Sequence, residues 1–255
     1  MVRVLKYKQG QLTISKSFLR FVVITIMLSG AIAWAATAIP EGATVLVGRT
    51  QTRTSPTPQN VTADAGNVTE VNITANSQTQ AWQGFFGDVN GSLVLEDASG
   101  DTFYSWNLTN VSGEIYTSRD SAISFNLINP QNNCSRDNEL TEFGRSDSVN
   151  NTYRNNSNTP ALAVGTITIN TSTACATTTY ISSAPQANFF HSVILTDDCF
   201  PSPCNSTIGG NTSVYATPIE PERTGFDGIT YDYQVLVPVN RTAGFNTYFF
   251  YAELG

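Results

Sequence analysis

The sequence predicts an all-β protein, an antiparallel β-sandwich of the Ig-like or jelly-roll-like kind with a short helical insertion. The first observation is a period of two, because apolar and polar residues alternate over many short segments. The second is the set of turn signals between those segments, such as Asp97-Ala-Ser-Gly-Asp101. Many short strands with turns at such spacing favour two packed antiparallel sheets.

Residues 1–38 predict a signal peptide. Residues 1–20 carry five positive charges and no acid, and residues 21–40 carry no charge. Ala33-Trp-Ala35 and Ala36-Thr-Ala38 both fit the small-x-small pattern of a cleavage site. An uncleaved signal anchor stays an alternative, because about 20 uncharged residues just span a bilayer. A pilin-type leader cut at Gly10-Gln11 is disfavoured, since Lys16 and Arg20 interrupt the apolar segment that would follow.

Residues 39–60 are expected to form a short strand, Ala43–Val47, and then a Thr/Ser/Pro-rich linker. Residues 61–255 are expected to form the β-sandwich domain. Its candidate strands are Val68–Thr74, Gln80–Phe86, Ser92–Glu96, Thr102–Trp106, Glu114–Ser118, Ile123–Leu127, Val164–Ile169, Ala174–Ile181, Phe189–Leu195, Ser213–Ala216, Thr230–Pro238 and Asn246–Ala252. The last two are the most apolar and are expected at the centre of a sheet, with Pro238 at a strand end.

Two turns and one helix punctuate this pattern. Asp88-Val-Asn-Gly91 and Asp97–Asp101 are expected to be hairpin turns. Asp137–Gly144 has the composition of a short capped helix, with Leu140 and Phe143 facing inward. It lies in a polar insertion that runs from Asn129 to Pro160.

The charge balance after the leader excludes some partners. Residues 39–255 contain eight arginines, no lysine and 20 acidic residues, a net charge of −12. A basic footprint for nucleic acid or an anionic membrane surface is therefore missing, and a membrane contact is expected only if the signal segment stays uncleaved. The missing lysine also excludes Schiff-base chemistry and Lys–Asn isopeptide cross-links in the exported part.

Thirteen Asn-x-Ser/Thr sites in the exported part predict an N-glycosylated protein of the cell surface or the extracellular space. Such a site matters only if the chain meets a glycosyltransferase, and then it marks a surface position. The sites begin at Asn60, Asn67, Asn72, Asn90, Asn107, Asn110, Asn133, Asn150, Asn155, Asn170, Asn205, Asn211 and Asn240.

Four cysteines, an even number in an exported chain, predict two disulfides. They are Cys134, Cys175, Cys199 and Cys204. Three pairings are possible, and a tight Cys199–Cys204 loop together with Cys134–Cys175 is favoured. Metal binding by these cysteines is disfavoured, because His191 is the only histidine and no second cysteine pair has ligand spacing.

No catalytic constellation is found, and no cofactor is expected. His191 lies near Asp197 and Asp198, but no Gly-x-Ser-x-Gly elbow accompanies it, so a secreted hydrolase is the least favoured function. A structural Ca²⁺ is a weak alternative to turn capping for the acids Asp88, Glu96, Asp97 and Asp101. The loop that opens at Asp88 lacks an EF-hand's closing glutamate, since Ser99 occupies that position.

Several aromatic residues cluster between positions 82 and 106. Strand alternation turns some of these rings inward and leaves others outward, where they would stack on sugars or form a subunit interface. Trp82, Phe86 and Tyr104 are the candidate stacking residues. They support an alternative function, an extracellular carbohydrate-binding module.

Two stretches resemble secreted archaeal surface proteins of unassigned activity. One is Ala81-Trp-Gln-Gly-Phe-Phe-Gly-Asp-Val-Asn-Gly-Ser-Leu-Val-Leu-Glu-Asp-Ala98 with Phe103-Tyr-Ser-Trp106, and the other is Tyr231-Asp-Tyr-Gln-Val-Leu-Val-Pro-Val239 with Phe249-Phe-Tyr-Ala-Glu-Leu-Gly255. Together they cover about a quarter of the exported chain. The resemblance implies location at the cell surface and a β-rich fold, and it implies no site residue.

The expected function is that of a secreted structural or adhesive protein of the cell surface. A sharper version makes it a filament subunit, in which Ala43–Val47 adds to the sheet of the next copy. The simpler alternative pairs this strand with its own domain. The expected partners are other copies of the chain, envelope proteins and glycans.

Overall fold

The computed structural model describes residues 39–131, 147–153, 162–165, 167–169, 175–178, 180–181, 184–185, 190–197, 213–240 and 245–255. These residues form an all-β fold whose strands pair antiparallel, which confirms the predicted class. The predicted helix Asp137–Gly144 lies outside the described residues. One short helix, α2 (Val149–Thr152), occurs within the same polar insertion.

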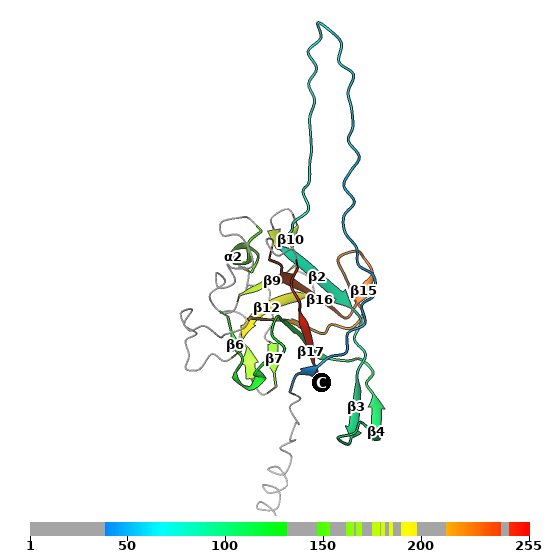
Figure 1. The fold of residues 1–255 in the computed structure, drawn as a ribbon, viewed down its shortest axis with the longest axis vertical. Coiled ribbons are helices and arrows are strands. Elements are labelled where there is room, and N and C mark those ends of the chain that lie inside the picture. The colour runs from blue at the N-terminus through cyan, green and yellow to red at the C-terminus, as the bar shows by residue number, and fades with distance from the viewer. Residues whose placement is uncertain are drawn as a thin grey trace, which may run out of the picture. The chain divides into compact units, whose positions relative to one another are not determined.

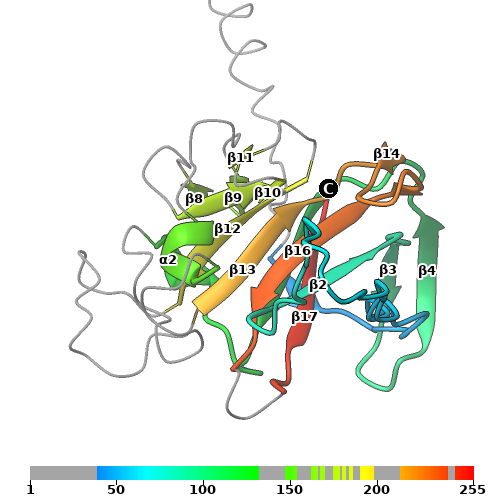
Figure 2. The ribbon, with the colours of Figure 1, turned by 90° about the horizontal axis from the view of Figure 1, so that it is seen from above.

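The largest sheet has seven strands (Figure 2). Its order is β1 (Glu41–Gly42), β17 (Phe249–Leu254), β5 (Gly113–Ser118), β13 (Ser213–Pro218), β12 (His191–Thr196) and β6 (Asn129–Pro130), and β9 (Ala176–Thr178) also pairs with β12. The middle of this order is therefore β5 and β13. The prediction that both C-terminal strands are central is wrong for β16 (Tyr233–Pro238), which lies in a separate two-stranded pair, whereas β17 lies inside the main sheet, second from its edge. β17 lies beside the edge strand β1, and Pro238 does end a strand, as predicted.

The remaining strands form two-stranded pairs. They are β2 (Trp82–Gly87) with β16 (Tyr233–Pro238), β3 (Ser92–Glu96) with β4 (Thr102–Asn107), β7 (Leu162–Val164) with β8 (Ile167–Ile169), β10 (Tyr180–Ile181) with β11 (Ala184–Pro185), and β14 (Arg223–Thr224) with β15 (Thr230–Tyr231).

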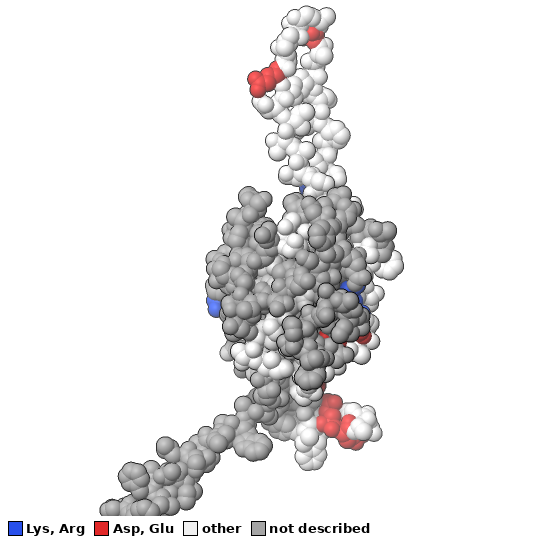
Figure 3. Space-filling model, turned by 90° about the vertical axis from the view of Figure 1, so that its left-hand side faces the viewer, with Lys and Arg blue, Asp and Glu red and all other residues white. Residues whose placement is uncertain are grey.

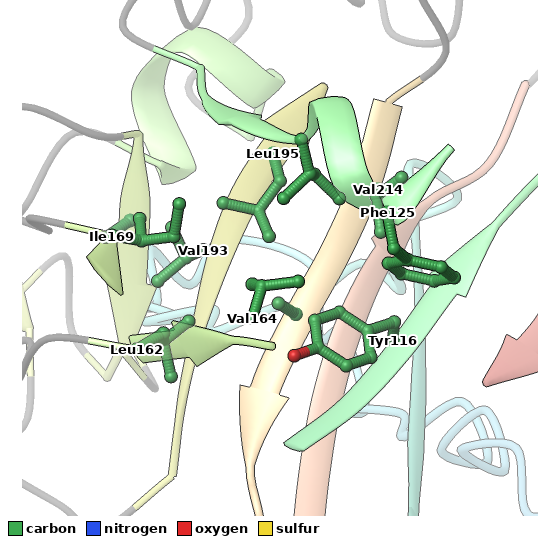
Figure 4. Close-up of a cluster of buried hydrophobic side chains, with 11 residues drawn as sticks. Tyr116, Phe125, Leu162, Val164, Ile169, Val193, Leu195 and Val214 are labelled. Carbon is green, nitrogen blue, oxygen red and sulfur yellow. The ribbon is translucent and has the colours of Figure 1, made fainter. Parts of the chain in front are cut away.

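One face of the central sheet is covered by β7, β8 and a 3₁₀ turn, η1 (Phe125–Leu127). Val193, Leu195 and Val214 from the sheet meet Leu162 and Val164 from the hairpin (Figure 4). Tyr116 stacks edge-on against Phe125, with ring centroids 5.2 Å apart. This cluster is the larger core of the described chain, and it requires the odd-numbered residues of β12 to point toward the hairpin.

The opposite face is covered by the β2–β16 pair (Figures 1 and 2). Ile194 and Tyr215 from the sheet pack against Val235 and Val237 of β16. A polar contact also joins the main sheet to this pair, since Thr217 Oγ1 of β13 donates to the Gln234 carbonyl of β16 at 2.9 Å. Both faces of the sheet are therefore covered at β12, and all of its residues are buried.

Several predicted strands are wrong, each for a local reason. Ile123–Leu127 ends in the turn η1. Val164–Ile169 is a hairpin, because Gly165 adopts a positive φ of 54° and reverses the chain between β7 and β8. Asp88–Gly91 is not a hairpin turn, since β2 pairs with β16 and β3 pairs with β4. The turn at Asp97–Asp101 does close a hairpin, as predicted.

The predicted strand Val68–Thr74 is also wrong. Residues 50–79 form a long exposed arm, whose two legs run away from the sheets and return (Figure 1). Gly66, at a φ of 86°, lies in the turn between the legs. Arg53 links the legs near their base through a 2.7 Å hydrogen bond to the Asn76 carbonyl. An alternating sequence does not make a strand where the chain offers no second surface to pack on.

Gly113 leaves no room for a side chain between β5 and β17 of the main sheet. Its φ is 117°, and a Cβ there would lie 1.9 Å from the Glu253 carbonyl oxygen.

We expect Gly113→Ala to lower the free energy of unfolding by more than about 2 kcal/mol, as measured by denaturant titration. Gly100→Ala is the matched control, since Gly100 has a φ of 85° and open space around it. Equal losses in both variants would refute the close-approach argument.

Two carboxylates hold the β7–β8 hairpin on the sheet. Glu114 and Glu253 are direct cross-strand neighbours on β5 and β17. Glu253 accepts hydrogen bonds from the Gly165 amide at 2.8 and 3.0 Å and from the Tyr116 hydroxyl at 2.9 Å. Glu114 accepts one from the Ala163 amide at 3.3 Å. Burial, and then the neighbouring Glu253 carboxylate, raise the pKa of Glu114 to about 7.

This pKa fixes a pH dependence of stability. The native state binds the Glu114 proton more tightly than the unfolded chain, whose glutamate titrates near 4.5. The stabilisation that protonated Glu114 adds to the free energy of unfolding is complete below about pH 4.5. It disappears as the pH rises through about 7. Glu114→Gln keeps the acceptor for Ala163 and removes the charge.

We therefore expect Glu114→Gln to raise the free energy of unfolding at pH 8 by about 1–2 kcal/mol, after allowance for solvent screening. The difference from the parent chain shrinks toward pH 4.5, where both side chains are neutral. Denaturant titrations across this range measure it. Glu220→Gln, in a surface pair with Arg223, is the control without that slope. A Glu114→Gln chain that is less stable at pH 8 would contradict the assignment.

Candidate functional site

An open groove of about 2560 Å³ lies beside β2 and β17. Aromatic rings from both strands form part of its wall. Phe85 meets Phe250 edge-on, with centroids 5.2 Å apart, and Tyr248 at 6.5 Å. Val89 and Leu254 add aliphatic surface. The groove is therefore apolar along its strands and long enough to follow them.

Both strands present backbone groups to this groove. β2 pairs with β16 on one side, and no backbone hydrogen bond among the described residues reaches its other edge. Within the described part of the chain, β17 is paired at its outer edge only by Glu41 and Gly42, followed by a bond from the Ala43 amide to the Phe250 carbonyl. Unpaired strand edges of this kind are templates for another strand.

Residues 43–52 run along the rim of the groove without closing it. The predicted strand Ala43–Val47 is wrong, because the chain leaves β17 after Ala43. Leu46 and Val47 are 91% and 85% exposed. The apolar alternation that predicted a strand is present in the sequence, but this segment lacks a neighbouring strand within its own fold.

Arg49 anchors the end of this segment. Its guanidinium donates to the Tyr231 hydroxyl at 2.6 Å and pairs with Asp227 at 3.3 Å. It also lies 5.8 Å from the centre of the Phe86 ring. Although partial desolvation opposes the shift, hydrogen bonds from the Ile229 amide and the Tyr231 hydroxyl lower the pKa of Asp227. The Asp227 carboxylate that pairs with Arg49 therefore stays charged through the neutral pH range.

The three predicted stacking residues do not converge on one site. Trp82 donates its Nε1–H to the Asp147 carbonyl at 2.7 Å, and its ring packs 5.7 Å from Tyr153. Phe86 packs against Phe226 and Tyr231, at 4.9 and 4.8 Å. Only Tyr104 is exposed, and it lies on the β3–β4 hairpin. Trp82 and Phe86 thus serve the packing of β2.

The described sequon asparagines are accessible. Asn60, Asn67, Asn72, Asn90, Asn107 and Asn110 are exposed, and Asn150 and Asn240 are half-buried. The other predicted positions, Asn133, Asn155, Asn170, Asn205 and Asn211, lie outside the described residues. Three of the exposed sites are on the arm, and none lies on Ala43–Val47 or on β2.

The cysteines and titratable residues contribute no converging site in the described part of the chain. Cys175 is disulfide-bonded and buried. Cys134, Cys199 and Cys204 lie outside the described residues, so the pairing stays a prediction. His191 begins β12 and is buried, as is Asp197. Asp97 caps its own turn through the amides of Ser99 and Asp101.

The described residues hold no group of three or more His, Cys, Asp or Glu side chains placed to bind a metal ion, so Asp88, Glu96, Asp97 and Asp101 do not converge. Nor do they include a helix with the length and apolar character to cross a membrane.

Comparison with known proteins adds no relative. No family model, no curated protein and no solved structure matches this chain.

The contacts of Trp82 predict a structural role. We expect Trp82→Ala to lower the free energy of unfolding by about 2–4 kcal/mol, because it removes ring packing and the bond to Asp147. Phe103→Ala, which removes a 90% exposed ring, should change it by less than about 0.5 kcal/mol. Thermal or denaturant unfolding measures both. A Trp82→Ala chain with parental stability would contradict this structural role, and Trp82 would again be a candidate ligand-binding residue.

Proposed function

We propose that the chain is a secreted, N-glycosylated structural or adhesive protein of the cell surface, and that its copies assemble by strand donation. One observation carries this proposal. The same chain presents an apolar segment without a partner strand, Ala43–Val47, and a groove with open strand edges beside it.

The donor and the acceptor match in length and chemistry. Five residues in strand conformation span about 17 Å, and the six residues of β2 span about 20 Å. Ala43, Val45 and Val47 would share one face, so a donated strand would place three apolar side chains toward the aromatic wall. Its backbone would pair with the open edge of β2, as in β-strand addition.

Export is supported by the sequence and by accessibility. Residues 1–38 have the charge pattern of a signal peptide, and four cysteines fit an oxidising compartment. The exposed sequon positions offer sites for glycans on the arm and at the hairpin. The Ig-like or jelly-roll-like class of the sandwich stays a prediction alongside this function.

Two other outcomes compete with donation. The segment at residues 43–49 would close into its own groove if the Arg49 anchor shifted, which yields a monomer. A carbohydrate-binding module has less support than before, because Trp82 and Phe86 are engaged in packing.

The test is a pair of substitutions in the donor segment. We expect Val45→Asp with Val47→Asp to abolish assembly or to raise its critical concentration at least about tenfold, because burying two carboxylates in an apolar groove is costly. Both side chains are exposed in the single chain, so its stability should not change. Thr50→Asp with Thr52→Asp, on the same exposed segment, is the matched control.

The measurement is electron microscopy of material sheared from producing cells, with mass spectrometry of the subunit and its N-terminus. Filaments of parental chains and of the control, but not of the donor variant, are the expected result. Filaments that persist in the donor variant would overturn strand donation. Soluble monomers of the parental chain would favour the alternative function, a carbohydrate-binding module.

A further inference from the structure

The β3–β4 hairpin stands apart from the other sheets (Figure 2). All residues of both strands are exposed, and within the described chain each strand pairs only with the other. One backbone bond, from the Leu108 amide to the Gly91 carbonyl, continues the ladder at its base. An isolated two-stranded hairpin is marginally stable in water, so this one calls for a further contact.

One face of the hairpin is apolar. The register pairs Leu93 with Trp106 and Leu95 with Tyr104, so these four side chains share a face. They are 62%, 64%, 58% and 50% exposed, in that order. Their exposed area is roughly 400–500 Å², the size at which an apolar patch on a soluble protein is usually functional.

The other face is more polar and carries a sequon. Ser92 pairs with Asn107, and Val94 pairs with Ser105. A glycan on Asn107 would extend from this face and leave the apolar face open. The hairpin therefore separates a side suited to solvent and sugar from a side suited to a protein contact.

We propose that the Leu93–Leu95–Tyr104–Trp106 face binds the same face of a second copy of this chain, about a two-fold axis. This contact uses none of the residues of the strand-donation groove and is independent of that proposal. Self-pairing would bury about 900 Å² in total, the size of a weak specific interface. A two-fold contact is self-complementary, so a single apolar face suffices on each copy.

Charge sets the orientation of the pair. The tip of the hairpin carries Glu96, Asp97 and Asp101, and acidic side chains are visible on this projection in Figure 3. A two-fold axis across the middle of the face places the two tips at opposite ends, about 20 Å apart. That distance exceeds the Debye length of about 8 Å at physiological salt, so the acids do not repel strongly.

A sugar is the less favoured occupant. Sugar and other small-ligand sites place a few polar groups among apolar walls to orient the ligand. Here the rings of Tyr104 and Trp106 face Leu95 and Leu93, with no charged or amide side chain on the same face. A second copy needs no such groups.

The experiment measures self-association of the Val45→Asp, Val47→Asp chain, in which strand donation is blocked. We expect a monomer–dimer equilibrium in sedimentation, with a dissociation constant on the order of 10–100 μM. Leu95→Glu with Trp106→Glu should weaken the dimer at least about tenfold. Val94→Glu with Ser105→Glu, a cross-strand pair on the opposite face, adds the same charge and should change the dissociation constant by less than about twofold.

Three results would overturn the proposal. The first is a chain with an intact hairpin face that stays monomeric at 200 μM or above, roughly twice the weakest expected dissociation constant. The second is a dimer that Leu95→Glu with Trp106→Glu does not weaken. The third is equal weakening of the dimer by the control pair of substitutions. A monomer that binds oligosaccharides through Trp106 would assign the face to glycans. Because the donation-blocked chain is used throughout, failure of the hairpin contact is distinguishable from failure of strand donation.

Discussion

The burial of β12 and β13 on both faces is the constraint on which the rest of the structure depends. An antiparallel sheet often leaves one face to water, but here Val193 and Leu195 point to one core and Ile194 and Tyr215 to another. Each face therefore needs a cover. The β7–β8 hairpin covers one, and the β2–β16 pair covers the other. Since β2 and β16 pair with each other and not with the main sheet, the outer edge of β2 is left open.

Local signals in the sequence predicted local structure well. The β3–β4 hairpin has the predicted bounds at Ser92–Glu96 and nearly so at Thr102–Asn107, because its strands and its Asp97 turn are contiguous. Pairing between distant segments was not predictable in this way. β2 and β16 lie about 150 residues apart in the sequence, and neither segment contains a pattern that indicates its pairing partner. The period-two pattern also predicted strands at Ala43–Val47 and Val68–Thr74, where the fold supplies no neighbouring strand.

The candidate site was only partly visible in the sequence. Trp82 and Phe86 were singled out as aromatic residues, but both rings pack against residues that are distant in the sequence, Tyr153 for Trp82 and Tyr231 for Phe86, and no local pattern predicts those contacts. The hairpin face had a clearer signal. Leu93 and Leu95 recur with a period of two, as do Tyr104 and Trp106 across the turn, and the register of a hairpin follows from its turn.

Exposed apolar surface on a chain in water is a liability unless something covers it. This chain shows three such surfaces, an unpaired segment, a groove with an open edge and a hairpin face. No sequon lies on Ala43–Val47, β2 or β17, and the sequon on β4, Asn107, lies on the opposite face of the hairpin from Leu93 and Trp106. In the proposed assembly, the segment and the groove complement each other head to tail, which would build an open chain of subunits. The proposed hairpin contact is self-complementary, so it would join two copies and then stop. Repeated along a polymer, even a weak hairpin contact gains strength through multivalency, so the two kinds of contact together would give lateral pairing of filaments without a second protein.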